Sequence, residues 1–381
     1  MTQVLSPAYA ANLANDVYGI KSAVTRDDFL DLYKSDMDIT TAKMASAVTG
    51  LYVLNKPHVM AILSTGKGRY QGHAFAAFMG TVTLYDALTD LNVGVTTGHT
   101  GSHVHQGFHR AFDSVLFELK QFVAGLKGVT VVHCVGHSLG GAIATLAADW
   151  LRASSSTARA NLYTFGCPRV GLSMFASKCT ARVQAGNIFR AHHDTDPVPM
   201  LPTWPFFHVP VSEVDYLIAS PVAAVLYENH FMRHYIRSAE AAPCWAQIQS
   251  NRPKGHGQLA IENWLKSDGA LSLTANTLSL FDAALQYVLQ KAAHATGIAL
   301  VLVFSTSFTL LDRMAMLLAK ARKLADDTSI WVQHLVRRMA ALVGVTITSG
   351  VTLTHEFIRL IFLKLHQRIA DMVRSISRAL P

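Results

Sequence analysis

Residues Val129–Leu151 read VTVVHCVGHSLGGAIATLAADWL, and this stretch decides the fold. The apolar, β-branched run Val129–Val135 predicts a buried strand, and the small-residue run Gly140–Leu151 predicts a helix that packs closely on a sheet. Between them, GHSLG (136–140) follows the G-x-S-x-G pattern, in which glycines permit a sharp strand-to-helix turn. Ser138 is therefore the predicted nucleophile. The Leu139 N–H and the helix dipole would face an oxyanion that forms beside it.

Strand and helix patterns alternate on both sides of this stretch. Apolar residues in Phe108–Leu126 recur at i, i+3, i+4 and i+7, which predicts an amphipathic helix. Short apolar runs predict further buried strands, and strands that alternate with helices indicate an α/β fold with a mainly parallel central sheet. The predicted strands are His58–Leu63, His73–Met79, Val129–Val135, Asn161–Phe165 and Asn187–Ala191.

A serine nucleophile needs a base, and the base needs an acid that orients it. In α/β-hydrolases these partners follow the serine in the order acid, then histidine. The predicted strand Asn187–Ala191 is followed directly by HHDTDP (192–197), so Asp194 and Asp196 are both candidates for the acid.

Five blocks of the sequence resemble class 3 lipases, a family that includes fungal triacylglycerol lipases and plant phospholipase A1-type enzymes. The resemblance covers roughly residues 45–240, and the blocks stand in the order that the family has. It implies an α/β-hydrolase that cleaves ester bonds of glycerolipids. The blocks are AFMGT (77–81), VHQGF (104–108), GHSLGGA (136–142), YTFGCPRVG (163–171) and FRAHHDTDPVPMLP (189–202).

The resemblance also assigns roles to residues. It makes Asp196 the acid, with Asp194 as the runner-up, and Thr81 the second oxyanion-hole residue beside Leu139. Two positions depart from the family pattern: Met79 stands where an arginine is usual, and Cys167 replaces a residue that is commonly polar.

The catalytic base is expected to be His230, because the family often has its catalytic histidine five residues before a tyrosine, here Tyr235. His234 and His256 are the alternatives. His208, within PFFHVP, is interpreted as a structural histidine that is hydrogen-bonded to the backbone.

Histidines and carboxylates gather in two places, yet neither group has a recognisable metal-ligand spacing. We therefore expect no required metal and no cofactor. The four cysteines form no CxxC pair, which gives no sign of a zinc site or a disulfide scaffold. The two groups are His99, His103, His105 and His109, and His192, His193, Asp194 and Asp196.

Charge and composition divide the chain into two regions. Residues 251–381 hold 15 Lys+Arg against 8 Asp+Glu, whereas residues 1–250 hold 18 against 17. We predict a hydrolase domain at 1–245 and an all-helical, apolar and basic region at 250–381. Such a mixture of charge and apolar runs favours a membrane surface over nucleic acid as a partner.

Three interpretations of the C-terminal region remain open. It is a helical cap whose apolar faces pack on the body or on each other, a module that docks on anionic membranes, or a membrane-spanning hairpin. The hairpin would use the uncharged runs Ala295–Leu311 and Met339–Thr354, while Phe357–Ile376 reads as a basic amphipathic helix.

These features together predict a serine lipase or phospholipase that works through an acyl-enzyme. The N-terminus MTQVLSPAYA lacks the pattern of a signal peptide, so we expect the protein in the producer's cytoplasm or exported without a leader to act at a target membrane. A lipase body with an apolar helical tail also resembles antibacterial effectors delivered by type VI secretion, which implies a neutralising (immunity) partner. The alternative is a membrane-binding or membrane-disrupting protein whose hydrolase body is inert.

Overall fold

The computed structural model describes most of the chain's residues. They are residues 4–21, 23–38, 40, 42–48, 57–80, 94–154, 158–203, 205–211, 215–221, 225–248, 256–269, 271–272, 274–297, 310–324, 326–347 and 351–379.

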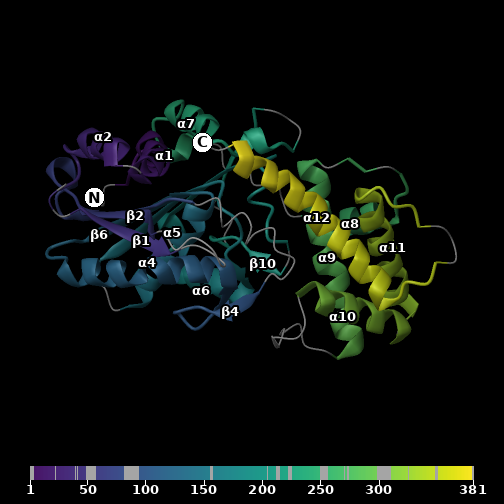
Figure 1. Ribbon diagram of the computed structural model, residues 1–381. Coiled ribbons are helices and arrows are strands. Elements are labelled where there is room, and N and C mark those ends of the chain that lie inside the picture. Colours follow the sequence, from purple (N-terminus) through teal and green to yellow (C-terminus); the bar gives the residue numbers. More distant parts are fainter. Residues whose placement is uncertain are drawn as a thin grey trace.

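A mixed sheet of seven described strands lies at the centre of the N-terminal body, in the order β1-β2-β3-β6-β7-β9-β11 (Figure 1). The pairs from β3 to β11 are parallel, whereas β1–β2 and β2–β3 are antiparallel. The expectation of a mainly parallel sheet is confirmed. The strands are β1 Lys43–Val48, β2 Pro57–Thr65, β3 His73–Phe78, β6 Val131–His137, β7 Arg159–Phe165, β9 Ile188–His193 and β11 Tyr216–Ile218.

The five strands predicted from sequence appear as β2, β3, β6, β7 and β9, with their ends shifted by at most two residues. Strands β1 and β11 were not predicted. β1 reads KMASAV, a short stretch in which lysine and serine interrupt small and apolar residues without alternation, and β11 has three residues. Such segments become strands because the sheet edge offers them hydrogen-bond partners, a tertiary effect that local pattern does not carry.

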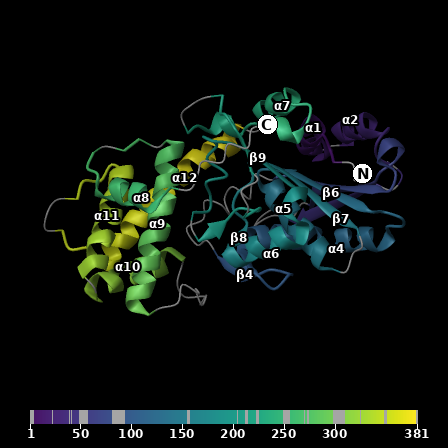
Figure 2. The same ribbon diagram turned by 180° about the vertical axis from the view of Figure 1, so that it is seen from behind.

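Helices cover both faces of this sheet (Figures 1 and 2). The predicted helices Phe108–Leu126 and Gly140–Leu151 are confirmed as α4 and α5, which lie with α6 on one face. α1 and α7 cover the other face, and α2 lies beside α1. Apolar side chains between each layer and the sheet form the core. The helices are α1 Pro7–Asp16, α2 Ala23–Tyr33, α4 Gln106–Gly125, α5 Leu139–Ala153, α6 Ser173–Val183 and α7 Met232–Glu240.

A second, smaller antiparallel sheet lies beside α4 and α6, in the order β10-β8-β5-β4. Its hairpin β4–β5 leads directly into α4, where the His105 side chain caps the helix by accepting hydrogen bonds from the Gly107 and Phe108 N–H groups. Short 3-10 turns join other elements. These elements are β4 Val95–Thr97, β5 His103–His105, β8 Gly171–Leu172 and β10 Phe206–Phe207, with η1 Val17–Lys21, η2 Gly68–Tyr70, η3 Ala185–Asn187, η4 Tyr227–His230 and η5 Trp245–Gln247.

From Gln258 onward, all regular elements in the described residues are helices, and they form a bundle beside the body (Figures 1 and 2). Arg169 of the body forms an ion pair with Asp282 of the bundle at 2.8 Å. The last helix, α12, extends back from the bundle and contacts η4. The helices are α8 Gln258–Lys266, α9 Ala275–Thr296, α10 Leu310–Leu324, α11 Asp326–Leu342 and α12 His355–Ala379.

The apolar faces of these helices pack mainly against one another, as the cap interpretation expects. Buried side chains from four helices share one core, including Leu285, Leu318, Met339 and Ile361. No helix in the described part of the chain is long and apolar enough to cross a membrane. Within the run Met339–Thr354, α11 ends at Leu342, and much of the run Ala295–Leu311 lies outside the described residues.

Candidate active site

Ser138 lies at the sharp turn between β6 and α5, in a backbone conformation that L-residues rarely adopt. Its φ is 56° and its ψ is −125°. A Cβ added to Gly136 would lie 2.2 Å from the Gly140 carbonyl oxygen, so only glycine fits at that point of the turn. Such a backbone costs about 1–3 kcal/mol and persists where the surrounding structure enforces it, often at functional sites.

The N-terminus of α5 and the end of β3 meet beside this serine. A Cβ added to Gly140 would lie 2.2 Å from the Phe78 carbonyl oxygen and 3.0 Å from the Gly80 nitrogen, so glycine lets the two segments touch. The Leu139 N–H follows Ser138 directly, as predicted for an oxyanion donor. Thr81, the other predicted donor, lies outside the described residues. Met79 is buried in the core, where the family has an arginine.

Asp196 and His230 form a buried pair. His230 Nδ1 lies 2.7 Å from Asp196 Oδ2, and neither side chain is exposed to solvent. The Tyr235 hydroxyl donates to the same oxygen at 2.7 Å, and the Val198 N–H donates to Oδ1 at 2.9 Å. Burial alone would raise the pKa of Asp196, but His230 and these hydrogen bonds hold it below its ordinary value. The carboxylate therefore stays ionised and accepts a hydrogen bond from the Nδ1–H group of His230.

Backbone contacts bring this pair next to the serine turn. The Ser138 N–H donates to the Phe165 carbonyl at 2.8 Å, and Gly166, the next residue, lies against the pair. A Cβ on Gly166 would lie 2.8 Å from Asp196 Oδ2 and 2.9 Å from the His230 ring. The His230 ring also lies 4.5 Å, centroid to centroid, from that of His137, the residue before Ser138. The structure thus places Ser138, Asp196 and His230 in one neighbourhood.

A chain of hydrogen bonds that the sequence did not predict links the serine turn to His230 on one side and, through Tyr18, to the end of β3 on the other. His137 Nε2 donates to the His230 carbonyl at 2.9 Å, and the Tyr18 hydroxyl lies 3.2 Å from His137 Nδ1. The Gly80 N–H in turn donates to the Tyr18 hydroxyl at 3.3 Å. Burial and the neighbouring His230 lower the pKa of His137 to about 3, so its ring is neutral with one donor and one acceptor nitrogen. Tyr18 is a positioning residue here, and nothing in its local sequence signals this.

The alternative site residues have other partners. Asp194 accepts hydrogen bonds from the backbone and hydroxyl of Ser220, at 3.1 Å for the backbone N–H. His256 lies 2.9 Å from the Ser279 hydroxyl in α9. His208 contacts the guanidinium groups of Arg169 and Arg190 at 3.3 and 3.2 Å. These contacts fit a structural role, but they are made with side chains and not with the backbone that the sequence interpretation expected.

The group His192, His193, Asp194 and Asp196 is dispersed by the fold. His192 approaches Asp215, and His193 Nδ1 donates to the Asn229 carbonyl. Alternation within β9 sends His192 and His193 to different faces of the sheet, and Asp194 and Asp196 follow in the turn after the strand.

Three buried histidines predict a loss of stability in acid. Burial lowers the pKa values of His105, His133 and His137 to about 3, against 6.5 for the free side chain. The unfolded chain therefore binds more protons than the folded chain between about pH 6.5 and pH 3. The free energy of unfolding should fall as the pH drops through this window, by up to about 1.4 kcal/mol per pH unit for each histidine.

Urea titrations at pH 7, 6, 5 and 4 measure this effect. We expect the urea midpoint to fall steeply below pH 6, because total stability is typically only about 5–15 kcal/mol. His133→Gln, which removes one of the three titrating groups, should flatten the slope. A midpoint that stays constant from pH 7 to pH 4 would contradict the prediction.

A mixed α/β sheet with a serine at a strand-to-helix turn, beside a buried aspartate–histidine pair, defines the α/β-hydrolase architecture. Comparison with known proteins agrees, because residues 75–206 match the sequence model of the family Lipase (class 3). The resemblance to class 3 lipases noted in the sequence is thereby confirmed.

Several characterised proteins are similar to parts of the chain. It is 34% identical over 165 residues to a secreted mono- and diacylglycerol lipase 1 of Fusarium solani, covering 42% of this chain and 48% of that protein. It is 36% identical over 103 residues to the toxin TseL of Vibrio cholerae, covering 27% and 15%. The chain thus spans about half the length or less of these relatives. The solved Rhizomucor miehei triacylglyceride lipase is 25% identical, with a TM-score of 0.42 over 55% of this chain and 78% of that chain.

Proposed function

We propose that this protein is a serine lipase that hydrolyses carboxylic ester bonds of glycerolipids. The observation that carries the proposal is the buried Asp196–His230 pair, which lies against the strained turn of Ser138. The match of residues 75–206 to class 3 lipases supports the same chemistry.

The proposed mechanism assigns one task to each residue. Asp196 holds the Nδ1 proton of His230, which leaves Nε2 to take the proton of the Ser138 hydroxyl as it attacks the ester carbonyl. His230 then protonates the departing alcohol, and the acyl group remains on Ser138. Water, deprotonated by His230, releases the fatty acid. The Leu139 N–H and Thr81 are the proposed donors to the oxyanion.

Substrate access requires a movement in this conformation. Ser138 is 1% exposed, while Asp196 and His230 are fully buried. A buried triad is protected from water until substrate arrives. We propose that contact with a lipid surface triggers the movement that exposes Ser138 to the substrate.

The proposed substrate class is a glycerolipid held at an anionic membrane. The Fusarium solani relative is named for mono- and diacylglycerol, which supports a glycerolipid. Lysines exposed on the C-terminal bundle, among them Lys266, Lys320, Lys323 and Lys364, support docking on anionic lipid, and they favour phospholipid over neutral fat.

Fatty-acid release from a panel of lipids tests the proposal. The purified chain is incubated with mono-, di- and triacylglycerol emulsions and with vesicles of phosphatidylethanolamine and phosphatidylglycerol. Release from at least one of them is expected. No release, together with vesicle leakage, would instead support a membrane-disrupting protein with an inert hydrolase body. Equal or faster turnover of triacylglycerol would remove the preference for phospholipid.

A paired substitution tests the membrane-docking part separately. Lys320→Glu with Lys323→Glu should weaken binding to phosphatidylglycerol vesicles at low salt, because each surface cation contributes roughly 1 kcal/mol to such binding. Lys127→Glu, an exposed lysine of the hydrolase body, is the matched control and should bind as the wild type does.

We also propose that the chain is an antibacterial effector with a neutralising (immunity) partner. The similarity to the toxin TseL supports this proposal. Directed to the bacterial periplasm, the wild-type chain should stop growth, and Ser138→Ala should not. Growth that is unaffected by the periplasmic wild-type enzyme would argue against the effector role while leaving the lipase chemistry intact.

A further inference from the structure

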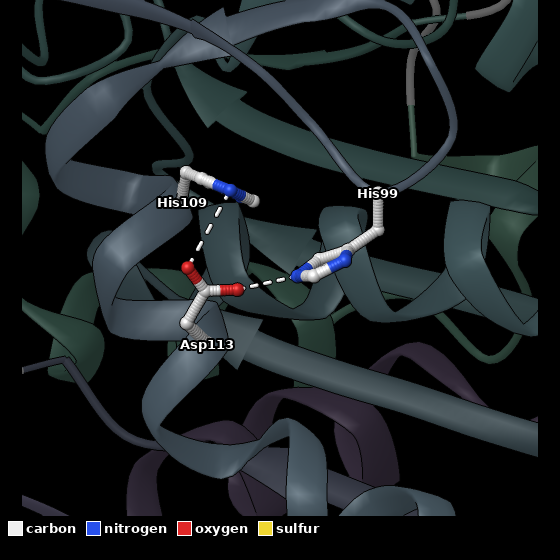
Figure 3. A group of neighbouring side chains, drawn as sticks. All are labelled: His99, His109 and Asp113. Atoms are coloured by element: carbon white, nitrogen blue, oxygen red, sulfur yellow. Dashed lines mark hydrogen bonds and ion pairs between the residues drawn. The ribbon is translucent and has the colours of Figure 1, made fainter.

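Two histidines and an aspartate converge at the start of α4, away from the serine turn (Figure 3). His109 and Asp113 stand one helical turn apart on α4, and His99 reaches them from the hairpin between β4 and β5. Asp113 lies between the two rings, with one carboxylate oxygen toward each histidine. The gap between His109 Nε2 and Asp113 Oδ2 is 3.4 Å, and His99 Nε2 contacts Oδ1.

We propose that His99, His109 and Asp113 bind a divalent transition-metal ion of the Zn²⁺ class. One ligand atom from each residue lies within 4.8 Å of the other two. Zn–N and Zn–O bonds of about 2.0–2.1 Å in a tetrahedron place ligand atoms ~3.3 Å apart. Small rotations of the exposed His99 and Asp113 side chains reach that spacing. Two imidazoles and a carboxylate leave a fourth position for water.

The hairpin that carries His99 is held in place from its other side. The Thr100 hydroxyl donates to Asp149 at 2.6 Å, and Arg182 forms an ion pair with the same carboxylate at 2.5 Å. Within the hairpin, the Gly98 N–H donates to the Ser102 carbonyl at 2.8 Å. His99 is therefore presented to α4 by an anchored loop, which limits the entropy that metal binding must remove.

The His109 ring presents one of its two nitrogens to the cluster. Its Nε2 atom lies 3.4 Å from Asp113 Oδ2. Its Nδ1 atom is buried and has no hydrogen-bond partner among the described residues. Nε2 is therefore the nitrogen that is placed to bind the metal beside Asp113.

Bound metal would join the β4–β5 hairpin to α4 and stabilise the folded chain by mass action. The site is separate from the proposed catalytic residues, and its function is structural. The sequence pattern predicts no required metal. Of the four histidines between 99 and 109, His99 and His109 lie next to each other, and the third proposed ligand is Asp113, which the sequence grouping did not include.

Zinc binding to the full-length, untagged chain tests the proposal. Chelator-stripped protein with Cys244→Ser, which removes an exposed thiol, is titrated with ZnCl₂ against a chromophoric chelator, and thermal unfolding is followed in parallel. We expect one Zn²⁺ per chain and a rise in melting temperature. Co²⁺ in place of Zn²⁺ should give the intense visible absorption of a four-coordinate site.

Single variants locate the metal. His99→Ala and Asp113→Asn should each weaken Zn²⁺ binding by ~10-fold or more, since loss of even an outer-shell partner costs 10–100-fold. His103→Ala, at an exposed histidine of the same hairpin, is the matched control. It should bind Zn²⁺ as tightly as the parent protein, which is the Cys244→Ser chain. Absence of binding to the parent, or equal binding by His99→Ala, would overturn the proposal. The first result would leave the three residues as an ion-pair cluster, and the second would place the metal elsewhere.

Discussion

Replacing Ser138 by alanine is expected to lower the rate of fatty-acid release by several orders of magnitude, up to roughly 10⁶-fold. The reason is chemical, because no other group in the described site is placed at the N-terminus of α5 to form an acyl-enzyme. Alanine keeps the Cβ of the strained turn, so the fold should remain. The rate is measured on whichever lipid the wild type cleaves fastest.

Two comparisons make this result decisive. Ser173→Ala, an exposed serine at the start of α6, should retain the wild-type rate. The urea midpoint of Ser138→Ala should stay close to that of the wild type, since serine and alanine carry the same Cβ at φ 56°. Retention of more than a tenth of the rate by Ser138→Ala would exclude Ser138 as the nucleophile.

The second large effect is expected at Asp196. Asp196→Asn should lower the rate of release by roughly 10³- to 10⁴-fold, because an amide cannot stabilise the imidazolium and can hold His230 in the wrong tautomer. The change is isosteric, but an amide has one acceptor oxygen, so only one of the two positions that the Tyr235 hydroxyl and the Val198 N–H contact can still accept a hydrogen bond. The loss should appear in kcat rather than in vesicle binding.

Asp194→Asn is the matched control for this experiment. It removes the charge of a carboxylate that lies two residues from Asp196 in the sequence and contacts Ser220 instead of His230. The rate of this variant should stay within a few-fold of the wild type. A greater loss in Asp194→Asn than in Asp196→Asn would assign the acid to Asp194 and contradict the geometry of the buried pair.

The local sequence predicted the turn at Ser138 and the strand and helix on either side of it. The strand before Ser138, the small-residue helix after it and the glycines at 136 and 140 are all properties of adjacent residues. Hydrophobic periodicity and turn chemistry act over a few residues, so they can be read from the chain directly. The resemblance to class 3 lipases likewise depends on short continuous blocks, and the match to residues 75–206 confirms it.

The sequence pattern alone could not choose between candidate residues of the same type that stand in similar positions, such as the two candidates for the catalytic acid. Asp194 and Asp196 both follow β9, yet of these two aspartates it is Asp196 that contacts His230, while Asp194 contacts Ser220. The chain turns there and sends the two side chains in different directions. The apolar faces of the described C-terminal helices posed a similar question. Apolarity predicts burial but not the partner, and in the structure the helices bury those faces on one another.

The sequence by itself determined the strand-turn-helix unit, the α/β class and the set of candidate residues. Only the tertiary structure decided which candidates meet. Tyr18 lies 119 positions before His137, and His99 and Asp113 approach through a hairpin and a helix. Their contacts depend on how sheet, helices and loops pack, because long-range contacts form only once the core fixes the relative positions of elements that local propensity specifies one at a time.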